Sequence, residues 1–249
     1  MTSYHHFVSL DSSDGPMPTY FAAPEGREPH AGILVIQGMH GIGSFELQVA
    51  ERLAEHGFLA AVPDLFHRGP ACFTDEELGQ RRRGRMSDPQ VLGDVNVALT
   101  YVQAQPNVDA DRIGIVGFCM GGRVAYLMAA TSPAMRAAAD FYGGGVHRGE
   151  GGPSPLELTS RIRCPVIIFD GEEDAHPSPD EVRQTAAELA RHGVIHEVHI
   201  YPGVGHGFMS ATGSRRRAEA IDDAWSRLLA WFQQYVAAEV VGAGRPGNT

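Results

Sequence analysis

The sequence contains no lysine, and all 20 of its basic residues are arginine. This absence excludes chemistry that needs a lysine amine, such as a Schiff base with a carbonyl substrate or a phosphate-binding P-loop. Cysteine is also scarce, since only Cys72, Cys119 and Cys164 are present, without CxxC spacing. An odd number of widely separated cysteines favours free thiols over a disulfide framework.

Long apolar runs are missing as well. Without a run of about 18 apolar residues, no transmembrane helix is expected. Residues 1–10 lack the basic and apolar segments of a secretory signal, so we expect a cytoplasmic location. The formal net charge of −10 argues against nucleic acids and membranes as partners. We expect a small-molecule substrate as the partner, and a monomer or homodimer as the assembly.

Metal-binding motifs are absent too. The 12 histidines include no HExxH or similar spacing, so we expect neither a bound metal nor another cofactor. Arginine runs at residues 81–85 and 215–217 depart from the acidic average of the chain. We interpret both runs as solvated helix faces.

Short apolar runs alternate with amphipathic segments along the chain. This alternation predicts the α/β class, with a mostly parallel central sheet and helices on both faces. The expected strands cover residues 8–10, 19–22, 33–36, 58–62, 112–116, 137–142, 166–169 and 196–201. The expected helices cover residues 44–56, 91–103, 120–130, 179–192 and 215–238. We expect one domain over residues 1–241, followed by a disordered tail at 242–249.

The segment Gly-Phe-Cys-Met-Gly-Gly, residues 117–122, carries the strongest functional signal. It follows one expected strand and opens the next expected helix, which is the setting of a nucleophile elbow in an α/β hydrolase. Glycines on both sides remove Cβ atoms that would clash in so sharp a turn. The helix N-terminus favours a negatively charged thiolate on Cys119. The pattern therefore predicts a cysteine nucleophile.

The two partners of a nucleophile in this fold follow it in the order acid, then histidine. Asp174 lies in the loop after the expected strand 166–169, with Glu172 and Glu173 as alternatives. His206 lies between two glycines in the loop after the expected strand 196–201. His206 would keep Cys119 as a thiolate or remove its proton, and Asp174 would fix the imidazole tautomer.

An oxyanion formed during attack on a carbonyl needs two N–H donors. The amide of Met120, next after the nucleophile, is the first expected donor. The second is expected from the loop at residues 37–41, where Met39 is the preferred candidate.

These motifs resemble those of the dienelactone hydrolase family, the carboxymethylenebutenolidases. The resemblance extends over residues 12–232 and includes Val-Pro-Asp-Leu at 62–65, the cysteine elbow, the Asp174 loop and Gly-His-Gly-Phe at 205–208. It implies one domain without a large lid, a small cleft over the sheet, and hydrolysis of small cyclic esters by Cys119, His206 and Asp174.

The chain departs from the family pattern at two positions. Gly38 stands where the family has a glutamate that interacts with the resting thiol, and Ser210 stands where an arginine holds the substrate carboxylate. The resemblance implies a second substrate arginine among Arg81, Arg82, Arg83 and Arg85, with Arg83 preferred. Gly38, His40, Phe208 and Ser210 complete the candidate substrate contacts. We therefore expect a more reactive resting thiol than in the family, and a preference for neutral or less charged esters and lactones.

Three functions fit the sequence. The first is a hydrolase of small esters or lactones, and the second is a thioesterase or broad carboxylesterase with the same triad. The third is a noncatalytic binding protein on a hydrolase fold. A thiol reagent that selectively labels Cys119 would argue against the third, and a panel of lactones, aryl esters and acyl thioesters would separate the first two.

Overall fold

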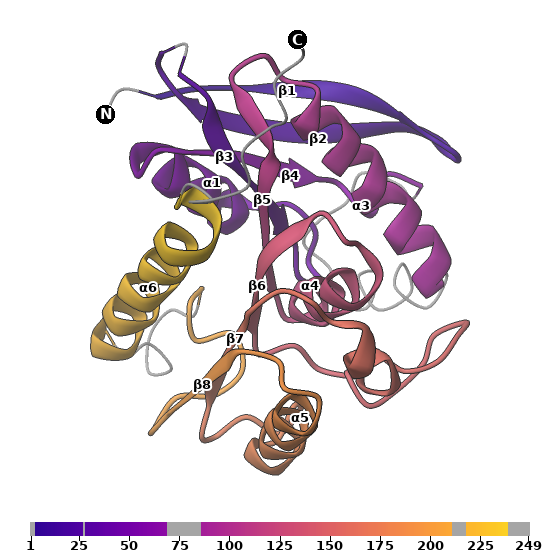
Figure 1. Ribbon diagram of the computed structural model, residues 1–249, viewed down its shortest axis with the longest axis vertical. Helices are drawn as coiled ribbons and strands as arrows, with labels where there is room; N and C mark the ends of the chain where they lie inside the picture. The colour runs from indigo at the N-terminus through magenta and orange to yellow at the C-terminus, as the bar shows by residue number, and fades with distance from the viewer. Residues whose placement is uncertain (1–2, 27, 69–85, 211–217, 239–249) are drawn as a thin grey trace, which may run out of the picture.

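The computed structural model describes residues 3–26, 28–68, 86–210 and 218–238 (Figure 1). In these ranges eight strands form one sheet in the order β1-β2-β4-β3-β5-β6-β7-β8. The strands are β1 (Ser3–Ser12), β2 (Gly15–Pro24), β3 (His30–Ile36), β4 (Phe58–Pro63), β5 (Val108–Phe118), β6 (Met135–Phe141), β7 (Val166–Gly171) and β8 (His196–Tyr201). The helices are α1 (Ser44–Glu55), α3 (Asp88–Gln103), α4 (Met120–Thr131), α5 (Pro179–Arg191), α6 (Ala218–Phe232), the 3₁₀-helix η1 (Leu156–Arg161) and the π-helix η3 (Gln233–Ala237).

Most of the sheet is parallel. β2 pairs antiparallel with both β1 and β4, whereas β4, β3, β5, β6, β7 and β8 pair in parallel with their neighbours. Every residue of β4 and β7 is buried. Such continuous apolar runs are typical of strands that are covered on both faces. The expected α/β-hydrolase class is confirmed.

Helices cover both faces of the sheet (Figure 1). α1 and α6 pack on one face, where Leu53 and Leu228 belong to the same buried cluster. α3, α4 and α5 pack on the other face, where Val95, Val124 and Leu189 share a second cluster. In the described ranges, no helix is both long and apolar enough to cross a membrane.

Several elements are longer than expected. α3 begins at Asp88 rather than residue 91, because Ser87 and Gln90 form a capping box and Pro89 stands in the first turn. β7 continues to Gly171, because Asp170 and Gly171 pair with Ile200 and Tyr201 of β8. Asp170 was expected in a loop and instead lies within the sheet.

The short helix η1, between β6 and β7, was not expected from the sequence. η3 lies within the helix expected at residues 215–238, but it continues α6 as a π-helix. The arginine runs at 81–85 and 215–217 and the tail at 242–249 fall outside the described residues, as does Cys72.

The parallel strands place their carboxyl ends at one edge of the sheet. The loops after β3, β5, β7 and β8 therefore meet at this edge, which is where α/β proteins bind ligands. These four loops carry Met39, Cys119, Asp174 and His206.

Candidate active site

Cys119 occupies a sharp turn between β5 and α4. Its backbone has φ 56° and ψ −118°, a conformation that non-glycine residues rarely adopt. A Cβ atom at Gly117 would lie 1.8 Å from the Gly121 carbonyl oxygen, and one at Gly121 would lie 2.2 Å from the Ile36 carbonyl oxygen. Both glycines are therefore required for the turn to close, as expected of a nucleophile elbow.

The thiol of Cys119 is largely enclosed, yet its surroundings lower its pKa. Burial opposes the thiolate, but a hydrogen bond and charge from His206 outweigh this effect, helped by the amides of Met120 and Met39. Together they lower the pKa of Cys119 below its usual value of 9.0. The two amides that hydrogen-bond the sulfur are the ones expected to form an oxyanion hole.

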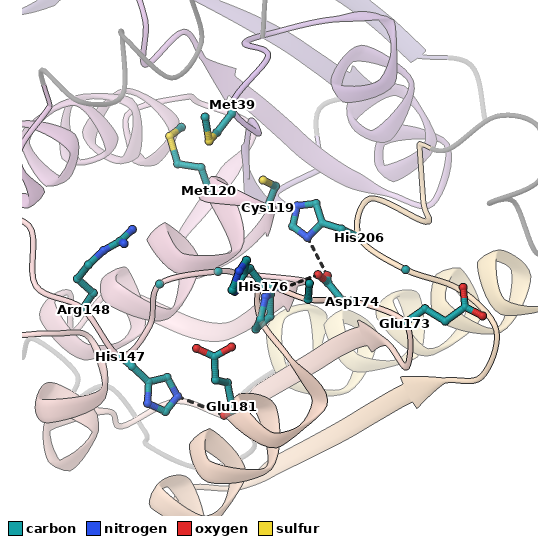
Figure 2. A pocket seen from close by; sticks show the side chains of 15 residues that line it. Met39, Cys119, Met120, His147, Arg148, Glu173, Asp174, His176, Glu181 and His206 are labelled. Atoms are coloured by element: carbon teal, nitrogen blue, oxygen red, sulfur yellow. Dashed lines mark hydrogen bonds and ion pairs between the residues drawn. The ribbon is translucent and has the colours of Figure 1, made fainter. Parts of the chain in front are cut away.

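His206 contacts Asp174 through a short hydrogen bond. Its Nδ1 lies 2.7 Å from Oδ2 of Asp174 (Figure 2). The other carboxylate oxygen, Oδ1, accepts the backbone N–H of His176 at 2.9 Å. Burial disfavours the imidazolium, but Asp174 and Cys119 outweigh this and raise the pKa of His206 to about 10. The arrangement supports an imidazolium between two anions.

The alternative acids do not contact His206. Glu172 and Glu173 are exposed, whereas Asp174 is buried. Figure 2 shows the Glu173 carboxylate pointing away from His206. Of the three acidic residues considered from the sequence, the structure brings Asp174 to the imidazole.

Two further carboxyl groups lie buried at the ends of neighbouring strands. Burial raises the pKa of Asp140, on β6, to about 7. Burial, together with the charge of Asp174, raises the pKa of Asp170, on β7, to about 8. Both carboxylate oxygens of Asp170 are buried without a hydrogen-bond partner in the described residues. Sequence reasoning missed both residues.

Gly38 lies beside Cys119, and its neighbour across the loop is Glu46 of α1. Oε2 of Glu46 accepts the Gly43 N–H at 2.9 Å. Burial raises the pKa of Glu46. Hydrogen bonds from the amides of Gly43, Glu46 and Gly38, and the charge of His40, oppose this rise. The carboxyl group of Glu46 therefore reaches the loop at Gly38, where no acidic side chain was expected. The pKa of Cys119 is nevertheless lowered.

Aromatic rings pack against His206. The Tyr142 ring meets the imidazole edge-on, with centroids 5.2 Å apart, and Phe208 packs on Tyr142 at 5.5 Å. Phe208 is 0% exposed. Its assignment as a substrate contact is therefore corrected, because its side chain turns into the apolar core rather than into the cleft.

A cavity of about 790 Å³ opens at the thiol (Figure 2). Its lining joins Cys119, His206 and Asp174 to Met39 and Met120. It also includes side chains that no sequence signal indicated, among them His147, Arg148, His176 and Glu181.

The remaining predicted substrate contacts do not face this cavity. His40 and Ser210 are exposed and are not among the described residues that line it. The Ser210 hydroxyl instead bonds the Gly207 carbonyl oxygen at 3.3 Å. Gly38 lies behind Cys119 rather than in the lining. Arg83 lies outside the described residues.

In the described ranges, no group of three or more His, Cys, Asp or Glu side chains is arranged to hold a metal ion. The histidines at the cavity make other contacts. His147 Nε2 lies 3.2 Å from both the Glu181 carbonyl oxygen and Thr185 Oγ1.

Comparison with known proteins places these features in a family. The sequence model of the dienelactone hydrolase family matches residues 17–236. A Synechocystis sp. protein, provisionally named a carboxymethylenebutenolidase, is 30% identical over 234 residues, covering 91% of this chain and 95% of the relative. A Bradyrhizobium sp. protein named a probable 2-oxo-3-(5-oxofuran-2-ylidene)propanoate lactonase is 31% identical over 240 residues, covering 94% and 95%.

Solved structures agree with these matches. A Klebsiella pneumoniae protein, provisionally named a dienelactone hydrolase, superposes with a TM-score of 0.88 at 29% identity, covering 94% of this chain and 100% of that one. A dienelactone hydrolase-like promiscuous phosphotriesterase from metagenomic libraries has a TM-score of 0.77 at 25% identity, covering 93% and 98%. The chain therefore belongs to the dienelactone hydrolase family, whose α/β hydrolases cleave carboxylic esters and lactones.

Proposed function

We propose that the chain hydrolyses small esters or lactones with Cys119 as nucleophile, His206 as acid and base, and Asp174 as the group that orients His206. One observation carries the proposal. A single cavity holds a thiol with a lowered pKa, and an imidazole whose pKa is raised to about 10 and which lies 2.7 Å from a buried carboxylate. A lowered thiol pKa and a neighbouring imidazolium both favour the thiolate, which is the nucleophilic form of cysteine.

In the first half-reaction the thiolate attacks the carbonyl carbon. A C–S bond forms, and the carbonyl oxygen becomes an oxyanion that the amides of Met120 and Met39 can stabilise. The oxyanion then collapses and the C–O bond to the alcohol breaks. The leaving oxygen takes its proton from the imidazolium of His206. In a lactone, this alcohol stays attached to the acyl chain.

In the second half-reaction water cleaves the thioester. Neutral His206 removes a proton from the water, whose oxygen attacks the acyl carbon. The C–S bond breaks, and the products are the carboxylic acid and the Cys119 thiolate beside imidazolium. Asp174 stabilises the charged imidazole in both halves without taking its proton.

The choice of small esters and lactones follows from the cleft and from the relatives. A space of about 790 Å³ matches the size of ordinary small-molecule pockets. The Bradyrhizobium relative is named for a lactone, which supports a cyclic ester as substrate here.

The test compares Cys119→Ala with Cys164→Ala in the hydrolysis of 4-nitrophenyl butyrate, dihydrocoumarin and an acyl thioester. Cys164 is the matched control, because it is a buried thiol whose pKa burial raises to about 12. We expect Cys119→Ala to lose at least about 10³-fold in kcat and Cys164→Ala to retain activity. Turnover that survives in purified Cys119→Ala would disprove the assignment. The thioester would show whether the same triad serves a thioesterase.

A further inference from the structure

We propose that Glu46 of α1 is a positioning residue, whose carboxylate holds the loop between β3 and α1 so that the Met39 amide faces the oxyanion. This inference rests on the proposed hydrolytic function and adds to it the group that orients the second oxyanion donor. Glu46 is not among the described residues that line the cavity. Its effect on the reaction therefore passes through the loop.

The loop needs a group that fixes it. It contains Gly38, Gly41 and Gly43, and glycine leaves a backbone free to adopt many conformations. The Gly41 N–H bonds the Gly38 carbonyl oxygen at 3.2 Å, and Gly41 itself has φ 87°. This bond is longer than the usual N–H to O distance of about 2.9–3.0 Å. A turn closed by so long a bond gains rigidity from contacts outside it.

The carboxylate of Glu46 bridges the two ends of this loop. Its Oε2 accepts the Gly43 N–H at 2.9 Å, and the carboxylate also accepts the Gly38 N–H. The next amide along the chain, that of Met39, hydrogen-bonds the sulfur of Cys119. Two planar peptide units that meet at the Gly38 Cα carry these neighbouring amides. A carboxylate that fixes the first amide therefore restricts the direction of the second.

An ordinary helix cap does not account for all of these contacts. A glutamate at the third position of a helix often bonds the N–H of the N-cap residue, as Glu46 does with Gly43. Glu46, however, also reaches Gly38, which lies before the cap, and it is only 8% exposed. Burying a carboxylate is costly unless its hydrogen bonds compensate. The burial and the second amide indicate a role beyond capping.

The position of Met39 decides what this role contributes. Figure 2 shows Met39 beside Met120, on the side of Cys119 that faces away from Asp174. The amides of Met39 and Met120 both hydrogen-bond the sulfur, so an oxyanion formed next to the sulfur lies within their reach. Both half-reactions pass through such an oxyanion, whereas the bound substrate carries none. A displaced Met39 amide therefore lowers kcat and leaves KM nearly unchanged.

The first experiment measures steady-state hydrolysis of 4-nitrophenyl butyrate. Glu46→Ala should lower kcat about 10²-fold, the loss expected for one oxyanion donor, and leave KM within a few-fold. Glu46→Gln keeps one acceptor oxygen and should lose about tenfold. Glu51→Ala is the matched control on α1, because Glu51 accepts the Tyr20 hydroxyl at 2.6 Å and its side chain is 39% exposed. An unchanged kcat in Glu46→Ala, or a rise in KM alone, would overturn the proposal.

The second experiment separates positioning from helix capping with the double variant Gly43→Ser/Glu46→Ala. Gly43 has φ −127°, which serine adopts without strain, and a Cβ there would lie 3.5 Å from Glu46 Oε2. Serine is a favourable N-cap residue, but its short side chain stays at the end of the helix. Urea unfolding should show the double variant recovering part of the stability lost in Glu46→Ala, while kcat stays low. Recovery of kcat together with stability would show that Glu46 acts as a cap alone.

The third experiment does not depend on turnover. Amide hydrogen exchange of the ¹⁵N-labelled protein is followed by NMR at Met39 and, as an internal control, at Met120. Glu46→Ala should accelerate exchange at Met39 by about tenfold or more and leave Met120, which the elbow fixes, nearly unchanged. Equal acceleration at both amides, or none at Met39, would refute the positioning role. If the wild type hydrolyses no ester, the triad assignment fails, and exchange at Met39 still decides whether Glu46 holds the loop.

Discussion

Gly38 lies directly against Cys119. A Cβ atom added to Gly38 would be 3.5 Å from the Cβ of Cys119 and 3.4 Å from the Phe118 carbonyl oxygen. Both distances are ordinary van der Waals contacts, so the first atom of a larger side chain fits there. The family's glutamate at this position would thus adjoin the thiol, and its absence removes a negative group from the site.

Replacing Gly38 should therefore control the reactivity of the thiol. In the wild type, His206 lowers the pKa of Cys119, so alkylation by iodoacetamide should persist below the usual thiol range. Gly38→Glu should shift the midpoint of the pH profile upward by about one unit or more, because a like charge disfavours the thiolate. Gly38→Gln has nearly the same shape without the charge and serves as the control. Identical profiles for the two variants would show that charge at this position has no influence.

Asp174 should matter far more than its acidic neighbours. Asp174→Asn keeps the size of the side chain but favours the wrong imidazole tautomer, so kcat should fall by up to about 10⁴-fold. Glu172→Gln and Glu173→Gln change exposed side chains and should leave kcat within a few-fold of the wild type. Steady-state kinetics on one ester would check this. If a glutamate variant is the one that loses activity, Asp174 is not the triad acid.

Asp140 and Asp170 should make the fold less stable as pH rises. An unfolded aspartate loses its proton near its usual pKa of 3.8, whereas Asp140 and Asp170 keep theirs up to about 7 and 8. Between these two pKa values, the folded state binds more protons than the unfolded state. The free energy of unfolding then falls by about 1.4 kcal/mol per pH unit for each such group.

Asp140→Asn isolates this effect, because asparagine is neutral throughout. Relative to the wild type, its free energy of unfolding should increase steadily between pH 5 and pH 7 and then level off. Asp170→Asn should behave likewise up to about pH 8. Urea unfolding at several pH values gives both curves, and Asp180→Asn, on the surface of α5, controls for the substitution itself. A difference that does not vary with pH would show that Asp140 is ionised in the folded protein.

The sequence predicted the elements around the sheet edge because their signals are local. A strand followed by glycine, cysteine and glycine at an expected helix start is enough to place Cys119, and loops after later parallel strands must return to the same edge. The start of α3 could also be predicted, because Ser87 and Gln90 have the spacing of a capping box. The helix start expected at residue 91 did not take this spacing into account.

The other residues of the site depend on contacts between distant segments. Glu46 reaches Gly38 only because α1 packs beside β3. Arg148 stands in a glycine-rich segment without periodicity, and its position depends on Arg123 and Asp88, far away in sequence. Phe208 follows His206 by two residues, yet its side chain turns into the core. Local sequence signals therefore predicted the residues at the edge of the sheet better than the contacts that depend on distant segments.

The buried ion pair of Arg123 and Asp88 should contribute both to the free energy of unfolding and to the shape of the cavity. Arg123 is 2% exposed, and its guanidinium satisfies Asp88 and the carbonyl oxygens of Gly145 and Arg148 together. Arg123→Met removes the cation and leaves the Asp88 carboxylate buried without its partner. Losing one member of a buried ion pair typically costs about 3–5 kcal/mol. Since Gly145 and Arg148 line the cavity, kcat/KM should fall as well.

The double variant Arg123→Met/Asp88→Leu tests whether the unpaired charge causes the loss. Replacing both members of a buried pair with apolar residues is often neutral or stabilising. Here two carbonyl oxygens and the Glu150 N–H, which donates to Asp88 at 3.1 Å, would still lose their partners. Urea unfolding should therefore show the double variant recovering part of the stability lost in Arg123→Met. Catalysis should not recover with it, because neither variant can hold the Arg148 backbone in place.

A double variant as unstable as Arg123→Met would mean that the bonds to the Arg148 segment, rather than the charge of Asp88, dominate. Recovery of both stability and kcat/KM would mean that Arg123 does not position the segment at all.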